Sequence, residues 1–132
     1  MTVELVWEHD LVLAGTSGQA SMRLDSSGVE GPSPVQALVF GLAACMAMDV
    51  VHILKKGRHD LRGLKVDLVA ERAPQDPRRV TAVTMSYTVT GNVPREQVQR
   101  AIDLSRDKYC SVWHSMREDI TLATAITITA GV

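Results

Sequence analysis

The stretch that decides the fold runs from Gly31 to Arg58 and reads Gly-Pro-Ser-Pro-Val-Gln-Ala-Leu-Val-Phe-Gly-Leu-Ala-Ala-Cys-Met-Ala-Met-Asp-Val-Val-His-Ile-Leu-Lys-Lys-Gly-Arg. Between residues 35 and 54 the strongly polar side chains are those of Gln36, Asp49 and His52. Pro34 stands where a first helical residue is favoured, and Gly57 follows two lysines as a C-terminal stop signal. The stretch therefore predicts one long helix, apolar on almost every side, that runs through the core of a soluble protein.

Two neighbouring stripes of this helix carry its most informative residues. At about 100° per residue, one stripe holds mostly small side chains that let another backbone approach closely: Ala37, Gly41, Ala44 and Met48. The adjacent stripe carries Cys45, Asp49 and His52. A free cysteine in such a helix is often a plain core residue, so a structural role for Cys45 stands beside a chemical one.

Composition limits the classes of function. The chain has 132 residues, of which 45% are hydrophobic, 22% charged and 4% aromatic, with a net charge of −1. These values predict one globular domain over residues 1–132 and no nucleic-acid partner, because neither a basic footprint nor stacking aromatics are present. Two cysteines far apart do not make a secreted disulfide scaffold and suit a reducing cytoplasm, which is the expected location.

The N-terminal region and the long helix bear on membrane association. Residues 1–10 carry no basic start and no apolar core of a secretory signal. The helix is long enough to span a bilayer, but Asp49 and His52 lie within it, so a membrane-spanning role is not expected.

The rest of the chain predicts six strands and two more helices. Alternating or β-branched runs mark strands at residues 2–7, 11–14, 20–24, 64–72, 80–90 and 120–130. Gly15-Thr-Ser-Gly18 is an expected turn, Pro94 opens a helix running to about Tyr109, and Ser111 is the expected N-cap of a short third helix. Clustered helices predict an α+β fold, with antiparallel sheets packed around the long buried helix.

The two thiols have different predicted environments. Cys110 follows Arg106 and Lys108 at the entry to the short helix, where cations and backbone N–H groups favour the thiolate and lower its pKa. Burial in the long helix raises the pKa of Cys45, and Asp49 one turn away raises it further. An arginine brought by the fold would activate Cys45, and Arg23 is a candidate.

Metal binding and hydrolase chemistry are weaker interpretations. Cys45, His52, Cys110 and His114 could form a four-ligand zinc set. Cys45 and His52 lie about 10.5 Å apart along a stiff helix, however, whereas zinc ligands usually come in short pairs from loops, so no metal site is predicted. The Gly-x-Ser-x-Gly elbow of many hydrolases is absent from the sequence.

Three motifs carry a resemblance to a known family. They are Pro-Ser-Pro-Val-Gln-Ala-Leu-Val-Phe-Gly-Leu-Ala-Ala-Cys ending at Cys45, Asp-Val-Val-His-Ile-Leu-Lys-Lys-Gly-Arg ending at Arg58, and Lys-Tyr-Cys-Ser-Val around Cys110. With them the chain resembles, over nearly its whole length, the OsmC/Ohr family of bacterial organic hydroperoxide reductases, and more closely a short OsmC-like branch.

The resemblance implies a fold, an assembly and a chemistry. It implies an OsmC-like fold in an intertwined homodimer, whose two long helices pack together while strands of both chains complete the sheets. Cys45 would attack an organic hydroperoxide to give a sulfenic acid, and Cys110 would resolve it to a disulfide. A dithiol such as a lipoylated protein would reset the pair, and no metal or organic cofactor would be needed.

One departure from the family keeps a second hypothesis open. The well-studied peroxidases hold their activating arginine with a glutamate near the start of the long helix, where this chain has Val35 and Gln36. Without the Arg/Glu pair, the alternative is a non-enzymatic OsmC-like module that binds a small apolar ligand or senses redox state. Other thiol chemistry, such as disulfide exchange or hydrolysis, is a further alternative.

Overall fold

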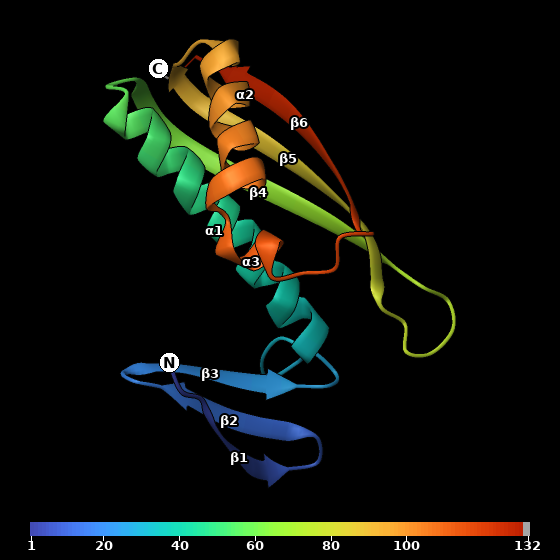
Figure 1. Cartoon of the computed structure of the whole chain (residues 1–132). Coiled ribbons are helices and arrows are strands. Elements are labelled where there is room, and N and C mark those ends of the chain that lie inside the picture. The colour runs from blue at the N-terminus through green and yellow to red at the C-terminus, as the bar shows by residue number, and fades with distance from the viewer. Residues whose placement is uncertain (131–132) are drawn as a thin grey trace. The chain divides into compact units, whose positions relative to one another are not determined.

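The computed structural model describes residues 1–130, which form two compact units, Met1–Phe40 and Gly41 onward (Figure 1). The first unit contains three strands, β1 (Glu4–His9), β2 (Val12–Ser17) and β3 (Ala20–Asp25), and the start of helix α1 (Pro34–Lys56). The second unit contains the rest of α1 and all later elements. The expectation of one domain over residues 1–132 stays a prediction.

The first unit is an antiparallel meander in the order β1-β2-β3, as the sequence predicts. The expected turn at residues 15–18 is displaced, because β2 continues to Ser17 and the chain turns at Gly18, whose φ is +59°. Gly15 lies inside the sheet between Leu5 and Met22, and a Cβ there would meet atoms of both at 3.1 Å. A glycine at position 15 therefore allows the neighbouring strands to pack closely and does not form a turn.

Helix α1 begins and ends where the sequence predicts. Ser33 and Gln36 form a reciprocal capping box: the Ser33 N–H donates to Gln36 Oε1 at 2.8 Å, and the Gln36 N–H donates to Ser33 Oγ at 3.2 Å. Lys55 and Lys56 occupy the last turn, where cations complement the helix dipole.

The second unit holds a mixed sheet in the order β4-β5-β6, with β4 at Asp60–Arg72, β5 at Val80–Asn92 and β6 at Thr121–Thr129. The β4–β5 hairpin is antiparallel, but β6 runs parallel to β5, so the prediction of antiparallel sheets is wrong for this strand. The helical connection after β5 carries the chain back along the sheet before β6 starts, as parallel pairing requires. The α+β class is confirmed.

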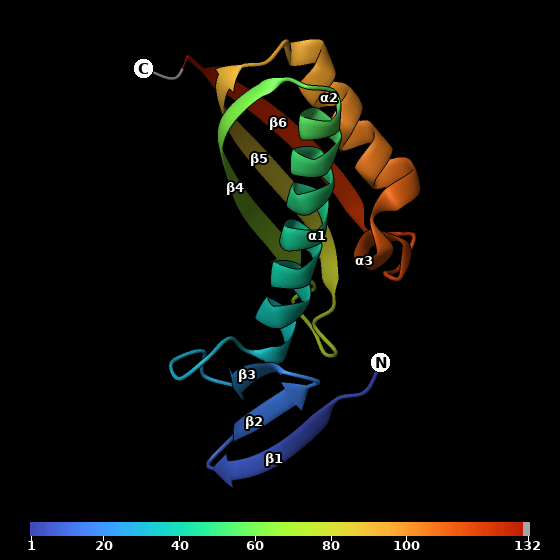
Figure 2. The same ribbon diagram turned by 90° about the vertical axis from the view of Figure 1, so that its left-hand side faces the viewer.

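The helices of the second unit lie on one face of its sheet (Figures 1 and 2). Alternate residues of β5 are buried on that face: Val83, Met85, Tyr87 and Val89. Helix α1 contributes a buried stripe with a four-residue spacing, made of Leu42, Met46, Val50 and Leu54. A sheet with one covered face and one wet face explains the alternating pattern of β4 and β5.

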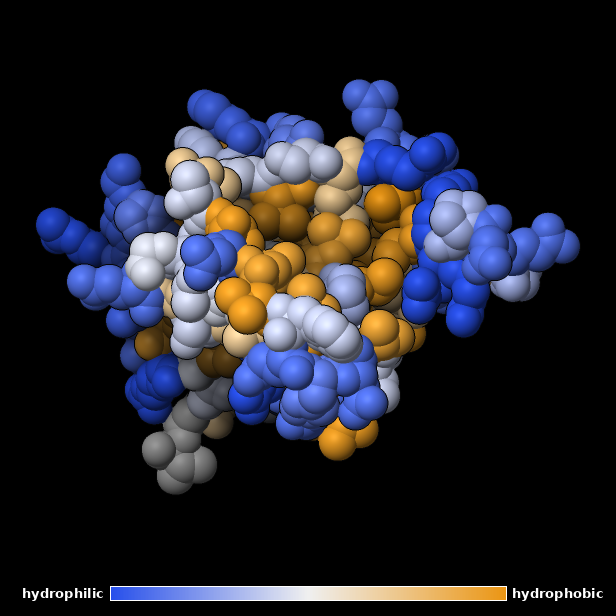
Figure 3. Space-filling view, turned by 90° about the horizontal axis from the view of Figure 1, so that it is seen from below, coloured by the Kyte–Doolittle hydropathy of each residue, from blue (hydrophilic) through white to orange (hydrophobic). Residues whose placement is uncertain are grey.

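Helix α1 is less buried than the sequence predicts. Ala44 is exposed, and Met48 is 69% exposed. A single sheet covers one side of a helix, so the apolar stripe on the other side has no cover within the described chain. Other hydrophobic side chains are visible at the surface in the view from below (Figure 3).

Three short elements connect β5 to β6: α2 (Arg95–Leu104), a π-helical turn η1 (Ser105–Tyr109) and α3 (Ser111–His114). The predicted second helix to Tyr109 thus changes from α to π geometry at Ser105. The prediction that Ser111 caps α3 is wrong, because the N-cap is Cys110, whose Sγ accepts a 3.3 Å hydrogen bond from the Trp113 N–H.

Helix α1 is also long and apolar enough to cross a bilayer. One such helix is weak evidence, because core helices of soluble proteins pass the same test. Its buried stripe of Leu42, Met46, Val50 and Leu54 is the pattern of a core helix and favours a soluble protein.

Candidate functional site

The two thiols lie together with a carboxylate in the second unit. Cys45 Sγ, Cys110 Sγ and a carboxylate oxygen of Asp49 are all within 4.8 Å of one another. Cys45 and Asp49 come from successive turns of α1, and Cys110 comes from the junction of η1 and α3. Both thiols are free; Cys45 is half-buried and Cys110 is fully buried. We call these three residues the thiol cluster.

The π-helical turn explains how Cys110 reaches the cluster. The Cys110 N–H donates a 2.8 Å hydrogen bond to the Ser105 carbonyl, which closes the wider π turn. Ser105 is fully buried, and its Oγ donates a 2.8 Å hydrogen bond to Asp49 Oδ2. One turn therefore both presents the Cys110 thiol and fixes the Asp49 carboxylate, as π turns often do at functional sites.

The environment of Cys110 keeps its thiol protonated. Burial raises the pKa of Cys110 to about 11; the Trp113 N–H acts in the opposite direction, and the hydrogen bond with Cys45 raises it further. The prediction of a lowered pKa for Cys110 is therefore wrong.

The cations near Cys110 in sequence do not act on its sulfur, and this explains the error. Arg106 pairs with Asp103 at 3.4 Å and Asp107 at 3.2 Å. Lys108 lies over the exposed Tyr109 ring, with its Nζ 5.2 Å from the ring centroid. Both cations are thus engaged with neighbours of their own, while the sulfur points into the core, where desolvation dominates.

Sequence reasoning missed two residues of this site, Ser105 and Tyr87. Burial of Tyr87 raises the pKa of its hydroxyl, and negative charge on nearby Cys110 or Asp49 raises it further. The position of Tyr87 in the apolar alternation of β5 was available as a signal, but it indicates only a core residue. Ser105 carries no signal, because its role depends on the π turn.

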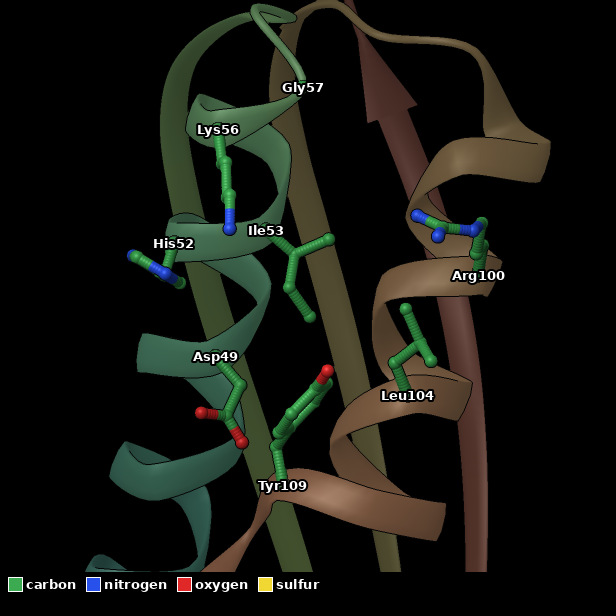
Figure 4. Close-up of a pocket in the computed structure, with 8 residues that line it drawn as sticks. All are labelled: Asp49, His52, Ile53, Lys56, Gly57, Arg100, Leu104 and Tyr109. Atoms are coloured by element: carbon green, nitrogen blue, oxygen red, sulfur yellow. The ribbon is translucent and has the colours of Figure 1, made fainter.

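A cleft of about 550 Å³ adjoins the thiol cluster and shares Asp49 with it. Figure 4 shows the Asp49 carboxylate beside the Tyr109 ring, with Arg100 across the cleft on α2. His52 and Lys56 of α1 add further basic groups to its lining. The cleft is therefore an amphipathic opening that leads to a carboxylate next to two sulfur atoms.

The thiol cluster has a donor set that suits a divalent metal. Two thiolates and a carboxylate are ordinary zinc ligands and would leave one position for water. Within residues 1–130 the group consists of Cys45, Asp49 and Cys110, so the considered set with His52 and His114 is not assembled. Both histidines are exposed. The absence of a metal requirement stays a prediction.

The residues considered for activating Cys45 have partners within the first unit. The Arg23 guanidinium makes a bidentate ion pair with Glu8, with Nε and Nη2 donating at 2.7 and 2.9 Å. Gln36, at one of the positions considered for the glutamate, uses its side chain in the capping box with Ser33. Each is thus engaged in structure of its own unit.

The chain matches the model of a known protein family over most of its length. The model of the family described as OsmC-like protein matches residues 25–125. The chain belongs to the OsmC-like protein family. The resemblance drawn from the sequence motifs is confirmed. Proteins of this family are typically soluble.

Known proteins resemble this chain over nearly its whole length. Protein YhfA of Escherichia coli K12 is 33% identical over 133 residues, which cover 98% of this chain and 99% of YhfA. An OsmC-like protein from Mycoplasma pneumoniae superposes with a TM-score of 0.84 at 15% identity, covering 97% of this chain and 96% of that one. The organic hydroperoxide resistance protein OhrB of Bacillus subtilis gives 0.65 at 16% identity, covering 96% and 98%. These two structural likenesses show the OsmC-like fold.

Proposed function

We propose that this protein is a thiol peroxidase that reduces organic hydroperoxides. The observation that carries the proposal is the approach of Cys45 Sγ and Cys110 Sγ to within 4.8 Å, from segments far apart in the chain. Two sulfur atoms at that separation can form a disulfide bond after small side-chain rotations. A purely structural role of either cysteine would not require the other one nearby.

The exposure of the two thiols supports different roles for them. Cys45 is half-buried and can meet a substrate, whereas Cys110 is fully buried with a pKa raised to about 11 by burial. Cys45 is therefore the peroxidatic thiol and Cys110 the resolving thiol.

The reaction proceeds in three balanced steps. The Cys45 thiol releases its proton and the thiolate attacks the hydroperoxide; the O–O bond breaks, Cys45 becomes a sulfenic acid, and the departing alkoxide takes up a proton and leaves as an alcohol. Cys110 then attacks Cys45 Sγ, so that an S–S bond forms, the S–O bond breaks and water is released. An external dithiol, such as a lipoylated protein, returns two electrons and two protons to the pair. No metal or organic cofactor enters these steps.

The family supports this chemistry. The OhrB likeness shows the fold alone, but OhrB is an organic hydroperoxide resistance protein, and the present chain places its two cysteines together within that fold. An antioxidant role in the cytoplasm follows as part of the proposal, because a reducing compartment supplies the dithiol reductant.

We propose a homodimer as the working assembly. The exposed stripe of α1, which includes Ala44 and Met48, offers small and apolar side chains to a second copy of the same helix. Light scattering coupled to size-exclusion chromatography should give twice the chain mass of 14.4 kDa. A monomeric mass would contradict this part of the proposal.

The peroxidase is tested by treating the reduced protein with cumene hydroperoxide and weighing it intact by mass spectrometry. The wild type should lose two hydrogens and yield a peptide linked between Cys45 and Cys110. Cys110→Ser should accumulate a Cys45 sulfenic acid that dimedone traps, and Cys45→Ser should stay unchanged. Retention of both free thiols in the wild type would contradict peroxidase activity.

A second candidate is the non-enzymatic ligand-binding or redox-sensing module. It is favoured by Gln36 at a position considered for the family glutamate and by the bidentate pairing of Arg23 with Glu8. The same experiment separates the two candidates. If both thiols stay free after treatment with the hydroperoxide and the protein binds a small apolar ligand, the second candidate function is supported.

A further inference from the structure

We propose that Asp49 accepts the proton of Cys110 in the disulfide-forming step and passes it to the departing hydroxide. This inference rests on the proposed function and deepens it. Asp49 acts on the second step of the cycle, not on the attack of Cys45 on the hydroperoxide.

Distance supports this role. A carboxylate oxygen of Asp49 lies within 4.8 Å of both sulfur atoms, a span that one water molecule bridges or a small side-chain rotation closes. Among the histidines and carboxylates of residues 1–130, Asp49 alone joins the two thiols in such a group. The carboxylate is held in place by the 2.8 Å hydrogen bond from Ser105 Oγ to Oδ2.

The resolving step needs a base at this place. Cys110 is fully buried, and burial raises its pKa to about 11, so the neutral thiol predominates near pH 7. A neutral thiol is a poor nucleophile, and it has no direct contact with solvent that could take its proton. The Trp113 N–H, 3.3 Å from Cys110 Sγ, can stabilise the thiolate once it forms but cannot remove the proton.

Asp49 also connects the buried Cys110 thiol to the open cleft. It lines the open cleft of about 550 Å³ as well as the thiol cluster, and Figure 4 shows its carboxylate at the cleft wall. The ionisable groups that line the cleft together with Asp49 are His52 and Lys56 of α1, Arg100 of α2 and Tyr109 of η1, and Tyr87 of β5 lies near it.

The atoms and charges of the step balance. The Cys110 S–H proton moves to Asp49, and the sulfur attacks Cys45 Sγ of the sulfenic acid. The S–S bond forms as the S–O bond breaks, and the leaving hydroxide takes the proton from Asp49 as water. Asp49 ends the step ionised, so this step needs no other acid or base.

The test isolates the resolving step from peroxide chemistry. Reduced protein is mixed with dithiobisnitrobenzoate in the presence of EDTA, and thionitrobenzoate is followed by stopped-flow absorbance. A first phase reports attack of Cys45 on the reagent, and a second reports attack of Cys110 on the resulting mixed disulfide. Because no hydroperoxide is used, a chain that fails as a peroxidase can still pass or fail this test.

Asp49→Asn should slow the second phase about 100-fold at pH 7, the lower range for general-base catalysis, whereas loss of a negative charge beside Cys45 should not slow the first phase. Asp49→Glu should recover much of the loss, and the exposed Asp107→Asn is the matched control with wild-type rates. The second phase of Asp49→Asn should then rise about tenfold per pH unit as the thiolate itself forms. An unchanged second phase, or a loss that is equal at every pH, would overturn the proposal.

The wild type provides a measurement that does not depend on the folding of a variant. With Asp49 as the base, the second phase of the wild type should be nearly constant between about pH 6 and pH 8, because attack then does not depend on prior ionisation of Cys110. A wild-type rate that rises about tenfold per pH unit over that range would track ionisation of Cys110 and overturn the proposal.

Discussion

Ser105 Oγ donates a 2.8 Å hydrogen bond to Asp49 Oδ2 across 56 positions of sequence. This bond ties the turn that follows α2 to the middle of α1, at the level of the two thiols. A buried hydroxyl and a carboxylate in this position are costly unless each is satisfied, so the pair fixes how the turn docks. The geometry of the thiol cluster therefore depends on a tertiary contact and not on a contiguous motif.

Ser105→Ala should destabilise the protein by about 1–3 kcal/mol, because the variant leaves the Asp49 carboxylate without its buried donor. Urea denaturation followed by circular dichroism measures the free energy of unfolding. The exposed Ser111→Ala, six positions along the chain, is the control and should change it by less than about 0.5 kcal/mol. Equal effects of the two substitutions would show that the Ser105 bond contributes nothing.

Local signals in the sequence were sufficient to predict where helix α1 begins and ends. Its start at Pro34 and its end at Lys56 follow from capping and stop residues that act within one turn. The direction of β6 could not be obtained in this way, because parallel or antiparallel pairing depends on the path of the whole connection from β5. The extent of burial of α1 likewise depends on what covers it, which no local pattern records.

The candidate site shows the same division. Helical spacing alone places Cys45 and Asp49 on one stripe, but their approach to Cys110 was implied by a family resemblance, since nothing local links the segments. The environment of Cys110 was predicted wrongly, because charged sequence neighbours were given more weight than burial. Ser105 belongs to the site because of the π turn at Ser105–Tyr109, and no pattern in the sequence of this segment predicts a π turn.

Stability should fall in alkaline solution because of Cys110. Burial raises its folded-state pKa to about 11, above the value of about 8.5 for an unfolded thiol. Between these values the unfolded chain has released a proton that the folded chain still holds. The free energy of unfolding should therefore fall by about 1.4 kcal/mol per pH unit in this window.

The control for this alkaline effect is Cys110→Ala, which removes the titrating thiol and leaves Tyr87, whose pKa burial also raises. Unfolding by urea at several pH values from about 8 to 11 should give a shallower decline for the variant than for the wild type. Parallel curves would mean that Cys110 is ionised equally easily in both states.

Asp25 should stabilise the loop that leads into α1, and this contribution should vanish in acid. Its carboxylate accepts hydrogen bonds from the Glu30 N–H at 3.0 Å, the Ser27 N–H at 2.9 Å and Ser27 Oγ at 2.8 Å. These bonds lower the pKa of Asp25 to about 2. Because the folded-state pKa lies below the unfolded value of about 3.9, the stabilisation is present above about pH 4 and is lost as the pH falls towards 2.

Asp25→Ala should accordingly lower the Tm at pH 7, and the difference from the wild type should shrink between about pH 4 and pH 2. Differential scanning calorimetry at several pH values measures both effects. A difference in Tm that persists unchanged at pH 2 would mean that the charge of Asp25 is not what the loop recognises.

Two methionines on α1 separate packing within the chain from packing against a second copy. Met46 is fully buried and Met48 is 69% exposed, although both are apolar and lie half a turn apart. Met46→Ala should lower the free energy of unfolding by about 2–5 kcal/mol, because it leaves a cavity that the β4-β5-β6 sheet cannot fill.

Met48→Glu should instead leave the fold intact and weaken the proposed dimer, because it places a charge in an apolar helix contact. Unfolding by urea and mass by light scattering measure the two effects separately. If Met48→Glu keeps the mass of a dimer, the second copy packs elsewhere, and the exposed stripe of α1 must be explained by a different partner.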